Sequence, residues 1–283
     1  MKEEPTWDDA WAELARVQVQ LGRFGGRPLA EALADARTAA ERALALDADN
    51  VTGLVALGWV RRTADWDWKG ADALFRRAKA LAPGDAGVLA DAAVLAFNLG
   101  RVDEGIALAR QAVDSDPLSA RVHAALGFIL QIAGRYEEAL VPLRRAAELA
   151  PGIVEVRTHQ ALALIHLGRL DEGERVLAEE PGEPYRMVGT ALLRSRRGDQ
   201  AGHRAVMDEF VARFGAEMPG YAAVQYALAG ETEPAFAWLE RAVERRDAAA
   251  AWMKTNNGYR SLHADPRWPA LLRRLGLADD QLR

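Results

Sequence analysis

Apolar residues recur at helical spacing through most of this chain. One such set is Leu140, Leu143, Ala146, Ala147, Leu149 and Ala150. Residues three or four positions apart lie on the same face of a helix, so this set predicts a helix with one buried face. No segment shows the period-two alternation of apolar and polar residues that a half-buried strand requires. The pattern therefore predicts an all-α protein.

Glycine-centred turns recur at a fixed distance. Three segments align without a gap, each 34 residues from the next, and begin Leu99-Gly100-Arg101, Ala133-Gly134-Arg135 and Leu167-Gly168-Arg169. Proline shows the same step, at Pro83, Pro117 and Pro151. Glycine favours the left-handed conformation that ends one helix, and proline stops the next. Each period is therefore predicted to hold a helical hairpin, and neighbouring hairpins must stack to bury their apolar faces.

These positions resemble the tetratricopeptide repeat family. Its small residue at the closest crossing of the two helices matches Gly58, Ala93, Gly127 and Ala161. Its alanines on the second helix match Ala71, Ala78, Ala112, Ala139 and Ala146. The resemblance implies an α–α superhelix, a solenoid of about seven helical hairpins followed by a C-terminal closing segment.

The repeat marks divide the chain into one solenoid domain spanning residues 1–283. The hairpins are expected at about 7–50, 51–85, 86–119, 120–153, 154–184, 185–215 and 216–247, with a cap at 248–283. The first hairpin has a longer turn at Gly22–Pro28, and Pro181–Pro184 shortens the fifth. Leucines 271, 272, 275 and 277 are expected to close the C-terminal end of the array, and Trp7 and Trp11 the N-terminal end.

Two stretches resemble a narrower group, the repeat arrays that bacterial signalling proteins join to a winged-helix regulator, a class III adenylate cyclase or a kinase module. The first comprises Trp59-Val60, Asp65-Trp66-Asp67-Trp68 and Phe75-Arg76-Arg77-Ala78. The second comprises Trp238–Ala242, Arg245-Arg246-Asp247, Asp265–Trp268 and Leu271–Leu277. Such arrays usually follow an output domain, which this sequence does not contain. The chain is therefore either an excised module or a separate gene product.

The repeat geometry implies a concave face lined by the first helix of each pair. The side chains expected there are Trp59, Arg62, Val94, Phe97, Asn98, Phe128, Gln131, Ile132, Leu162, Ile165 and His166. A partner segment covering the apolar members would gain about 25 cal/mol per Å² buried. The amides of Asn98 and Gln131 could pair with the backbone of an extended guest. In the alternative, these side chains pack against one another or against the chain's own ends.

The residue types for catalysis or metal binding are missing or scattered. The sequence has no cysteine and five histidines on separate elements, apart from His159 and His166 on one helix. No carboxylate lies between those two in a metalloprotease-type arrangement, and no glycine motif for phosphate appears. The acidic residues fall at turns and helix starts. We therefore expect no catalytic site, metal or cofactor.

The charge distribution excludes a strong attraction to nucleic acid. Residues 185–283 contain 15 Lys+Arg and 12 Asp+Glu, and residues 1–184 contain 21 and 29. This small basic surplus is too diffuse to neutralise a phosphate backbone. The acidic N-terminus does not resemble a secretory signal, and no apolar run reaches the roughly 20 residues that span a bilayer. The sequence predicts a cytoplasmic protein that binds neither nucleic acid nor membrane.

The sequence therefore predicts a non-catalytic scaffold that binds a protein or peptide partner in the concave groove. The narrower resemblance places it in a bacterial regulatory or signalling system, including transcription regulation, with the missing output domain as one possible partner. Self-association through an array end is a further possibility. The alternative is a ligand-sensing receptor whose superhelix closes on a small effector or a signalling peptide.

Overall fold

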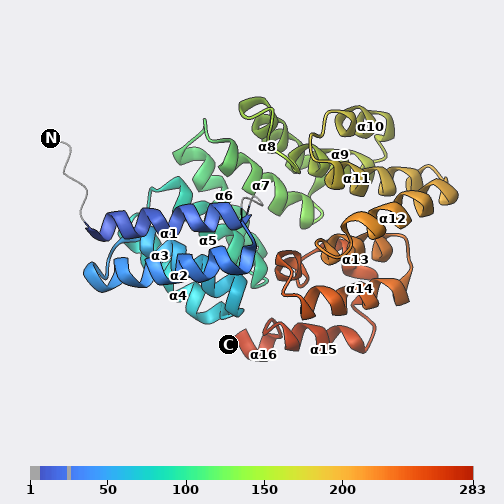
Figure 1. Cartoon of the computed structure of the whole chain (residues 1–283). Coiled ribbons are helices and arrows are strands. Elements are labelled where there is room, and N and C mark those ends of the chain that lie inside the picture. The colour runs from blue at the N-terminus through green and yellow to red at the C-terminus, as the bar shows by residue number, and fades with distance from the viewer. Residues whose placement is uncertain (1–6, 24–26, 283) are drawn as a thin grey trace.

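The computed structural model describes residues 7–23 and 27–282, and within these ranges all regular structure is helical. The first helices of the successive pairs are α1 (Trp7–Arg23), α3 (Val51–Val60), α5 (Ala86–Asn98), α7 (Ala120–Ile132), α9 (Val156–His166), α11 (Glu183–Arg196) and α13 (Pro219–Leu228). Their partners are α2 (Leu29–Leu46), α4 (Trp68–Leu81), α6 (Val102–Ser115), α8 (Tyr136–Leu149), α10 (Leu170–Ala178), α12 (Gln200–Phe214) and α14 (Thr232–Glu244). The predicted all-α superhelix of about seven hairpins is confirmed (Figure 1).

The turns between paired helices have the predicted glycine conformation. Gly100, Gly134 and Gly168 have φ of 87°, 82° and 78°, and Gly198 and Gly230 both have 79°. These values lie in the left-handed region that L-residues with a side chain rarely adopt. The amide that follows each glycine bonds back into the preceding helix, as Arg101 N does to Ala96 O at 2.9 Å.

Small residues bring the paired helices close together. A Cβ atom added at Gly127 would lie 2.5 Å from Cγ of Leu143, and one at Gly58 would lie 3.0 Å from the ring of Phe75. Ala93 and Ala161 occupy the equivalent positions and are fully buried. The short side chains let two backbones approach without a cavity, which keeps the interior closely packed.

The two ends of the predicted array differ from the middle. Trp11 is half-buried, with the guanidinium of Arg42 4.5 Å from the centre of its ring. Trp7 is 79% exposed, so the expectation that it seals the N-terminal end is wrong. Part of the predicted Gly22–Pro28 turn, residues 24–26, lies outside the described residues.

In the fifth pair, α10 has only 9 residues where α8 has 14, as Pro181–Pro184 predicts.

The C-terminal segment folds back against the first half of the molecule. It contains two 3₁₀ helices, η2 (Ala248–Trp252) and η3 (Asn257–Leu262), followed by α15 (Arg267–Arg274) and α16 (Asp279–Leu282). The indole Nε1 of Trp68 donates a hydrogen bond to Leu275 O at 2.6 Å. The C-terminus consequently lies near α4 (Figure 1). We call residues 247–282 the closing segment.

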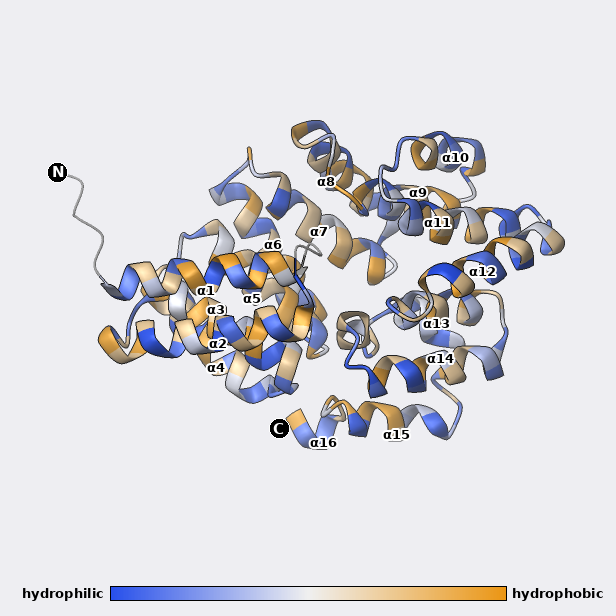
Figure 2. Cartoon of the chain, viewed as in Figure 1, coloured by the Kyte–Doolittle hydropathy of each residue, from blue (hydrophilic) through white to orange (hydrophobic). Residues whose placement is uncertain are grey.

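The closing segment shares one apolar core with the first hairpins. Leu271, Leu275 and Leu277 are at most 1% exposed, and they belong to the same buried cluster as Trp68 and Phe97. Leu272 is partly buried beside them. Figure 2 shows α15 with alternating apolar (orange) and polar (blue) bands. The leucines therefore close the C-terminal end, as the sequence predicts, and they do so against helices from the opposite end of the chain.

Candidate partner-binding surface

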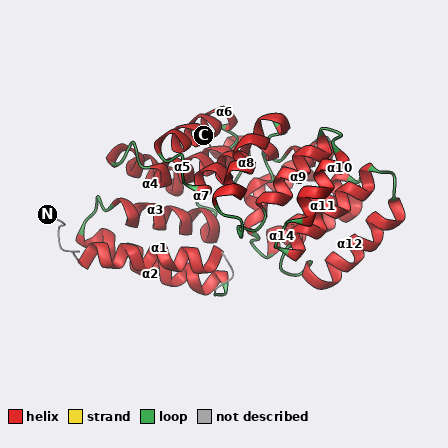
Figure 3. Ribbon diagram, turned by 90° about the horizontal axis from the view of Figure 1, so that it is seen from above, coloured by secondary structure: helices red, strands yellow, loops and turns green. Residues whose placement is uncertain are grey.

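The first helices form a continuous inner layer. Contacts link α5 to α7, α7 to α9, α9 to α11 and α11 to α13, while η2 and η3 of the closing segment pack against this layer at α5 and α13. Figure 3 shows α5, α7, α9 and α11 following one another along the molecule. The concave surface expected from the repeat is therefore this layer, and the closing segment lies on part of it.

At the C-terminal ends of α3 and α5 the predicted groove residues Trp59, Arg62, Phe97 and Asn98 are buried. Phe97 and Asn98 are 0% exposed, and the ring of Phe97 lies 5.7 Å from that of Trp252 in η2. Arg62 belongs to the π-helix η1 (Arg61–Asp65) that extends α3; its Nη1 donates to Asn98 Oδ1 at 3.0 Å, and its guanidinium lies 4.0 Å from the Trp59 ring centre. In this part of the layer the chain's own C-terminal segment occupies the place expected for a guest.

Two further predicted residues lie between repeats. Leu162 and Ile165 are 9% and 2% exposed and pack in a cluster with Leu177, Leu192 and Leu193. A Cβ atom at Gly173 would lie 2.9 Å from Ile165 Cγ1, so Ile165 faces its partner helix α10. These two side chains contribute to hairpin stacking.

The remaining predicted residues give a partly accessible surface on α5, α7 and α9. Val94, Phe128, Ile132 and His166 are half-buried, and Gln131 is 8% exposed beside them. The amide oxygen Oε1 of Gln131 lies 2.7 Å from His159 Nδ1, and the rings of Phe128 and His159 are 4.3 Å apart. We call Phe128, Gln131 and Ile132 on α7, with His159 and His166 on α9, the α7–α9 surface.

A carboxylate and two tyrosines extend this surface toward α13. Glu155 precedes α9, and its Oε1 lies 3.3 Å from His159 Nε2 while also accepting a hydrogen bond from the Tyr221 hydroxyl. The rings of Tyr185 and Tyr221 meet edge to face at 5.7 Å. Burial and the nearby carboxylates of Glu155, Glu180 and Asp247 raise the pKa of Tyr185, so its hydroxyl stays protonated. Side chains from four successive pairs therefore meet on the inner layer.

Sequence reasoning did not identify Glu155, Tyr185 and Tyr221. The available signal was position, because each tyrosine is the third residue of a first helix, α11 or α13. The sequence gives no such signal for Glu155. In the structure this residue has φ of 74°, a conformation unusual for a residue with a side chain. Its backbone amide is held by the buried carboxylate of Glu180, a contact across 25 residues.

His166 forms the edge of the α7–α9 surface and should make stability pH-dependent. Its ring stacks on that of Tyr136 at 4.4 Å, and burial, with Arg196 nearby, lowers the pKa of His166 to about 4. A base whose pKa is lower in the folded state than its unfolded value of about 6.5 is neutral when folded. The stabilisation contributed by neutral His166 is therefore complete above a pH of about 6.5, and it is lost as the pH falls from there toward 4.

The expected loss between pH 7.5 and pH 5 is about 1–2 kcal/mol from this residue, and a His166→Phe variant should lack it. Chemical denaturation of both proteins at the two pH values measures the difference. An unchanged gap between the wild type and His166→Phe at pH 7.5 and pH 5 would contradict the assignment.

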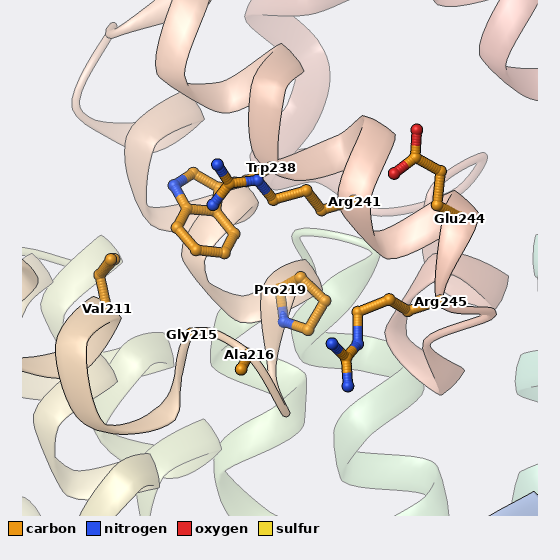
Figure 4. Close-up of a pocket in the computed structure, with 8 residues that line it drawn as sticks. All are labelled: Val211, Gly215, Ala216, Pro219, Trp238, Arg241, Glu244 and Arg245. Carbon is orange, nitrogen blue, oxygen red and sulfur yellow. The ribbon is translucent and has the colours of Figure 1, made fainter.

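A separate cavity of about 500 Å³ lies where α12, α13 and α14 meet (Figure 4). Its lining residues are Val211, Gly215, Ala216, Pro219, Trp238, Arg241, Glu244 and Arg245. The guanidinium of Arg241 lies 4.4 Å from the centre of the Trp238 ring, and Figure 4 shows Arg245 reaching toward Pro219 while Glu244 points away. This arrangement combines an aromatic wall with two cationic groups, which suits a small anionic ligand.

Neither a metal site nor a membrane-crossing element occurs in the described part of the chain. Within residues 7–23 and 27–282, no three His, Asp or Glu side chains are grouped as metal ligands. No helix in these same ranges combines the length and hydropathy needed to cross a bilayer.

Comparison with known proteins identifies the architecture. Residues 63–127, which run from η1 into α7, match the family model described as tetratricopeptide repeat. The fold is that of a tetratricopeptide-repeat protein. No relative was found among curated protein sequences.

Solved structures share this fold at low sequence identity. A tetratricopeptide repeat protein from Parabacteroides merdae ATCC 43184 is 18% identical with a TM-score of 0.58, and the match covers 94% of this chain and 98% of that one. PilW, described as a widely conserved type IV pilus biogenesis factor, is 17% identical with a TM-score of 0.57, covering 71% and 93%. Pseudomonas aeruginosa pilF is 17% identical with a TM-score of 0.55, covering 74% and 96%. The tetratricopeptide-repeat fold is typical of protein-interaction scaffolds.

Proposed function

We propose that this repeat protein is a non-catalytic scaffold that binds an extended polypeptide segment on the α7–α9 surface. The supporting observation is that the closing segment lies against α5 and α13, while Phe128, Ile132 and His166 on the intervening layer keep partly accessible side chains. An aromatic side chain in a partly enclosed position is a frequent anchor for a partner. The adjacent carboxylate of Glu155 favours a guest that carries a basic side chain there.

The partner belongs, in this proposal, to a bacterial regulatory or signalling system. The tryptophan-rich stretch around Trp66 and Trp68 and the arginine-rich stretch ending at Leu277 support it, because they resemble arrays joined to winged-helix regulators or class III adenylate cyclases. An output domain or a separate protein could each supply the bound segment. The proposed location is the cytoplasm.

Replacing Phe128 should weaken this complex strongly. We expect Phe128→Ala to weaken binding of a peptide selected from a random library against the wild-type chain by about 30-fold, which corresponds to about 2 kcal/mol. Calorimetry with the selected peptide measures the loss. Leu118→Ala is a suitable control, because Leu118 is 70% exposed on the loop between α6 and α7. Equal affinity of wild type and Phe128→Ala would exclude the α7–α9 surface as the peptide site.

A ligand-sensing receptor is the second candidate, and the cavity beside Trp238 favours it. Thermal unfolding with panels of short peptides and of anionic metabolites distinguishes the two functions, since a ligand at 100 times its Kd stabilises by about 2.7 kcal/mol. Stabilisation by peptides supports the scaffold. Stabilisation by metabolites alone, lost in Trp238→Ala, would instead assign the receptor function.

A further inference from the structure

The closing segment lies against the turns of two successive hairpins. A Cβ atom added at Gly100 would lie 3.0 Å from Lys254 Cε, and one added at Gly134 would lie 3.0 Å from Asn257 Nδ2. The later turns differ, because no described atom lies within 4 Å of a Cβ added at Gly168, Gly198 or Gly230. The closing segment therefore contacts the turns of the first half of the array and leaves those of the second half open.

One attachment of the closing segment supports the edge of the α7–α9 surface. Asn257 Nδ2 donates a hydrogen bond to the hydroxyl of Tyr136, the first residue of α8, at 3.2 Å. The ring of Tyr136 stacks on that of His166 at 4.4 Å, with an angle of 1° between the two planes. A shift of Asn257 would therefore be transmitted through one aromatic ring to a member of the surface.

A second attachment supports the opposite edge. Asp247 Oδ2 accepts a hydrogen bond from Gly220 N at 2.8 Å, and the hydroxyl of Tyr259 donates to Gly220 O at 3.1 Å. Gly220 directly precedes Tyr221, whose hydroxyl donates to Glu155 Oε1. The closing segment thus fixes the start of α13, from which a tyrosine reaches the carboxylate beside the α7–α9 surface.

The two attachments lie at opposite ends of the inner layer. Helix η2 packs against both α5 and α13, and η3 packs against α13, whereas α7, α9 and α11 lie between α5 and α13 in the layer. Figure 1 shows the end of the chain returning from α14 to the vicinity of α4. In an open array each hairpin contacts only its neighbours, so changes of angle between hairpins add up along the array. A segment that joins both ends removes this freedom.

We propose that the closing segment is a brace: it fixes the span of the inner layer between α5 and α13, with Asn257 and Asp247 as its positioning residues, and it holds the α7–α9 surface in the form that binds a partner. The second half of this inference rests on the proposed function. A segment that only sealed apolar surface would not respond to a bound partner. A brace must respond, because coupling between two sites is reciprocal: loosening the closing segment weakens partner binding by the same factor by which the partner tightens the closing segment.

Two pairs of glycines provide a matched test. Gly134 and Gly276 have φ of 82° and 71°, and a Cβ atom at Gly276 would lie 3.2 Å from Trp68 Cδ1. Gly168 and Gly198 have φ of 78° and 79° and face open space among the described atoms. Asparagine adopts this left-handed conformation more readily than most residues with a side chain. Gly134→Asn with Gly276→Asn, the covered-pair variant, therefore crowds the closing segment, and Gly168→Asn with Gly198→Asn, the open-pair variant, is its control.

A distance measurement tests the brace without any partner. The natural sequence has no cysteine, so Val141→Cys on α8 and Ala237→Cys on α14, both at exposed positions, can carry two spin labels. Double electron–electron resonance should give one narrow distance distribution in the otherwise wild-type chain and in the open-pair variant. The distribution should be at least about twofold broader in the covered-pair variant, because hairpins without the brace move relative to one another. An equally narrow distribution there overturns the brace, and circular dichroism checks that all variants fold.

Peptide binding tests the link to the α7–α9 surface. The covered-pair variant should bind the peptide selected against the wild-type chain about tenfold more weakly than the wild type, and the open-pair variant within about twofold of it. The comparison is balanced, since Gly134 and Gly168 each lie two residues beyond a member of the surface, Ile132 or His166. Saturating peptide should slow amide hydrogen exchange in residues 247–282 of the wild type by the same factor of about ten.

The possible results separate this inference from the proposed function. A broadened distance distribution with unchanged peptide affinity, or with unchanged exchange in the closing segment, overturns the link between the brace and the partner. Equal peptide binding by Phe128→Ala and the wild type removes the proposed peptide site and the link with it. The distance measurement still decides in that case whether the closing segment sets the span.

Discussion

Trp68→Ala is expected to lower the free energy of unfolding by about 3–5 kcal/mol, one of the largest effects of any single change in this chain. Trp68 is 3% exposed, and its indole holds the closing segment through the hydrogen bond to Leu275 O. Its ring also lies close to Gly276, where an added Cβ atom would be 3.2 Å from Trp68 Cδ1. Removing the side chain therefore opens a cavity between two parts of the chain 207 residues apart.

Trp68→Phe separates the hydrogen bond from the packing. It keeps an aromatic ring but leaves the Leu275 carbonyl without its donor, so a loss of about 1–2 kcal/mol is expected. Urea denaturation followed by circular dichroism gives both values, with Leu46→Ala as an exposed control expected to change stability by less than about 0.5 kcal/mol. Limited proteolysis should cut the closing segment faster in Trp68→Ala. If both variants behave like Leu46→Ala, the closing segment is not held at this contact.

Glu180→Ala should have a comparable effect, about 3 kcal/mol or more, through unpaired backbone groups. The carboxylate is 1% exposed and accepts three backbone hydrogen bonds: Oε1 from Glu155 N and Gly182 N, each at 3.0 Å, and Oε2 from Thr158 N at 3.1 Å. The N-cap residue of α9, Glu155, makes no capping hydrogen bond with its own side chain. Alanine would remove the acceptor of all three amides, of which the Thr158 amide is buried and the other two are partly buried.

The neighbouring residue provides the control for this prediction. Glu179 has a side chain 71% exposed and a single ion pair with Arg157 at 3.4 Å, so Glu179→Ala should change stability by less than about 1 kcal/mol. Glu180→Gln keeps one acceptor oxygen and should lie between the two. Denaturation curves of the three variants measure the order. Equal stability of Glu180→Ala and Glu179→Ala would show that this carboxylate does not support the start of α9.

The repeat itself could be predicted because its determinants are local. The glycine of each turn and the small residue of each crossing act within one hairpin, and 34-residue spacing makes them visible in the sequence. The outline of seven pairs follows from these marks. The burial of Phe97 could not be predicted in the same way, because it depends on Trp252, far along the chain.

The candidate surface could be predicted only in part, because it too depends on contacts between segments far apart in the sequence. The register of each first helix indicates which residues share a face, as Phe128 and Gln131 do three positions apart on α7. It does not indicate which of these faces another segment covers. Glu155 and Tyr221, 66 residues apart, meet through the path of the superhelix, which the hairpin period does not specify.

The return of the closing segment to α4 changes how the molecule should unfold. An open array of repeats has only nearest-neighbour contacts, so its ends can fray while the middle stays folded. Here the hydrogen bond from Trp68 to Leu275 joins the second hairpin to the last helices, and fraying of the closing segment or of the second hairpin must break that junction. Unfolding should accordingly approach a single all-or-none transition. Folding should be slower than in an open array, because this contact must close a loop of most of the chain.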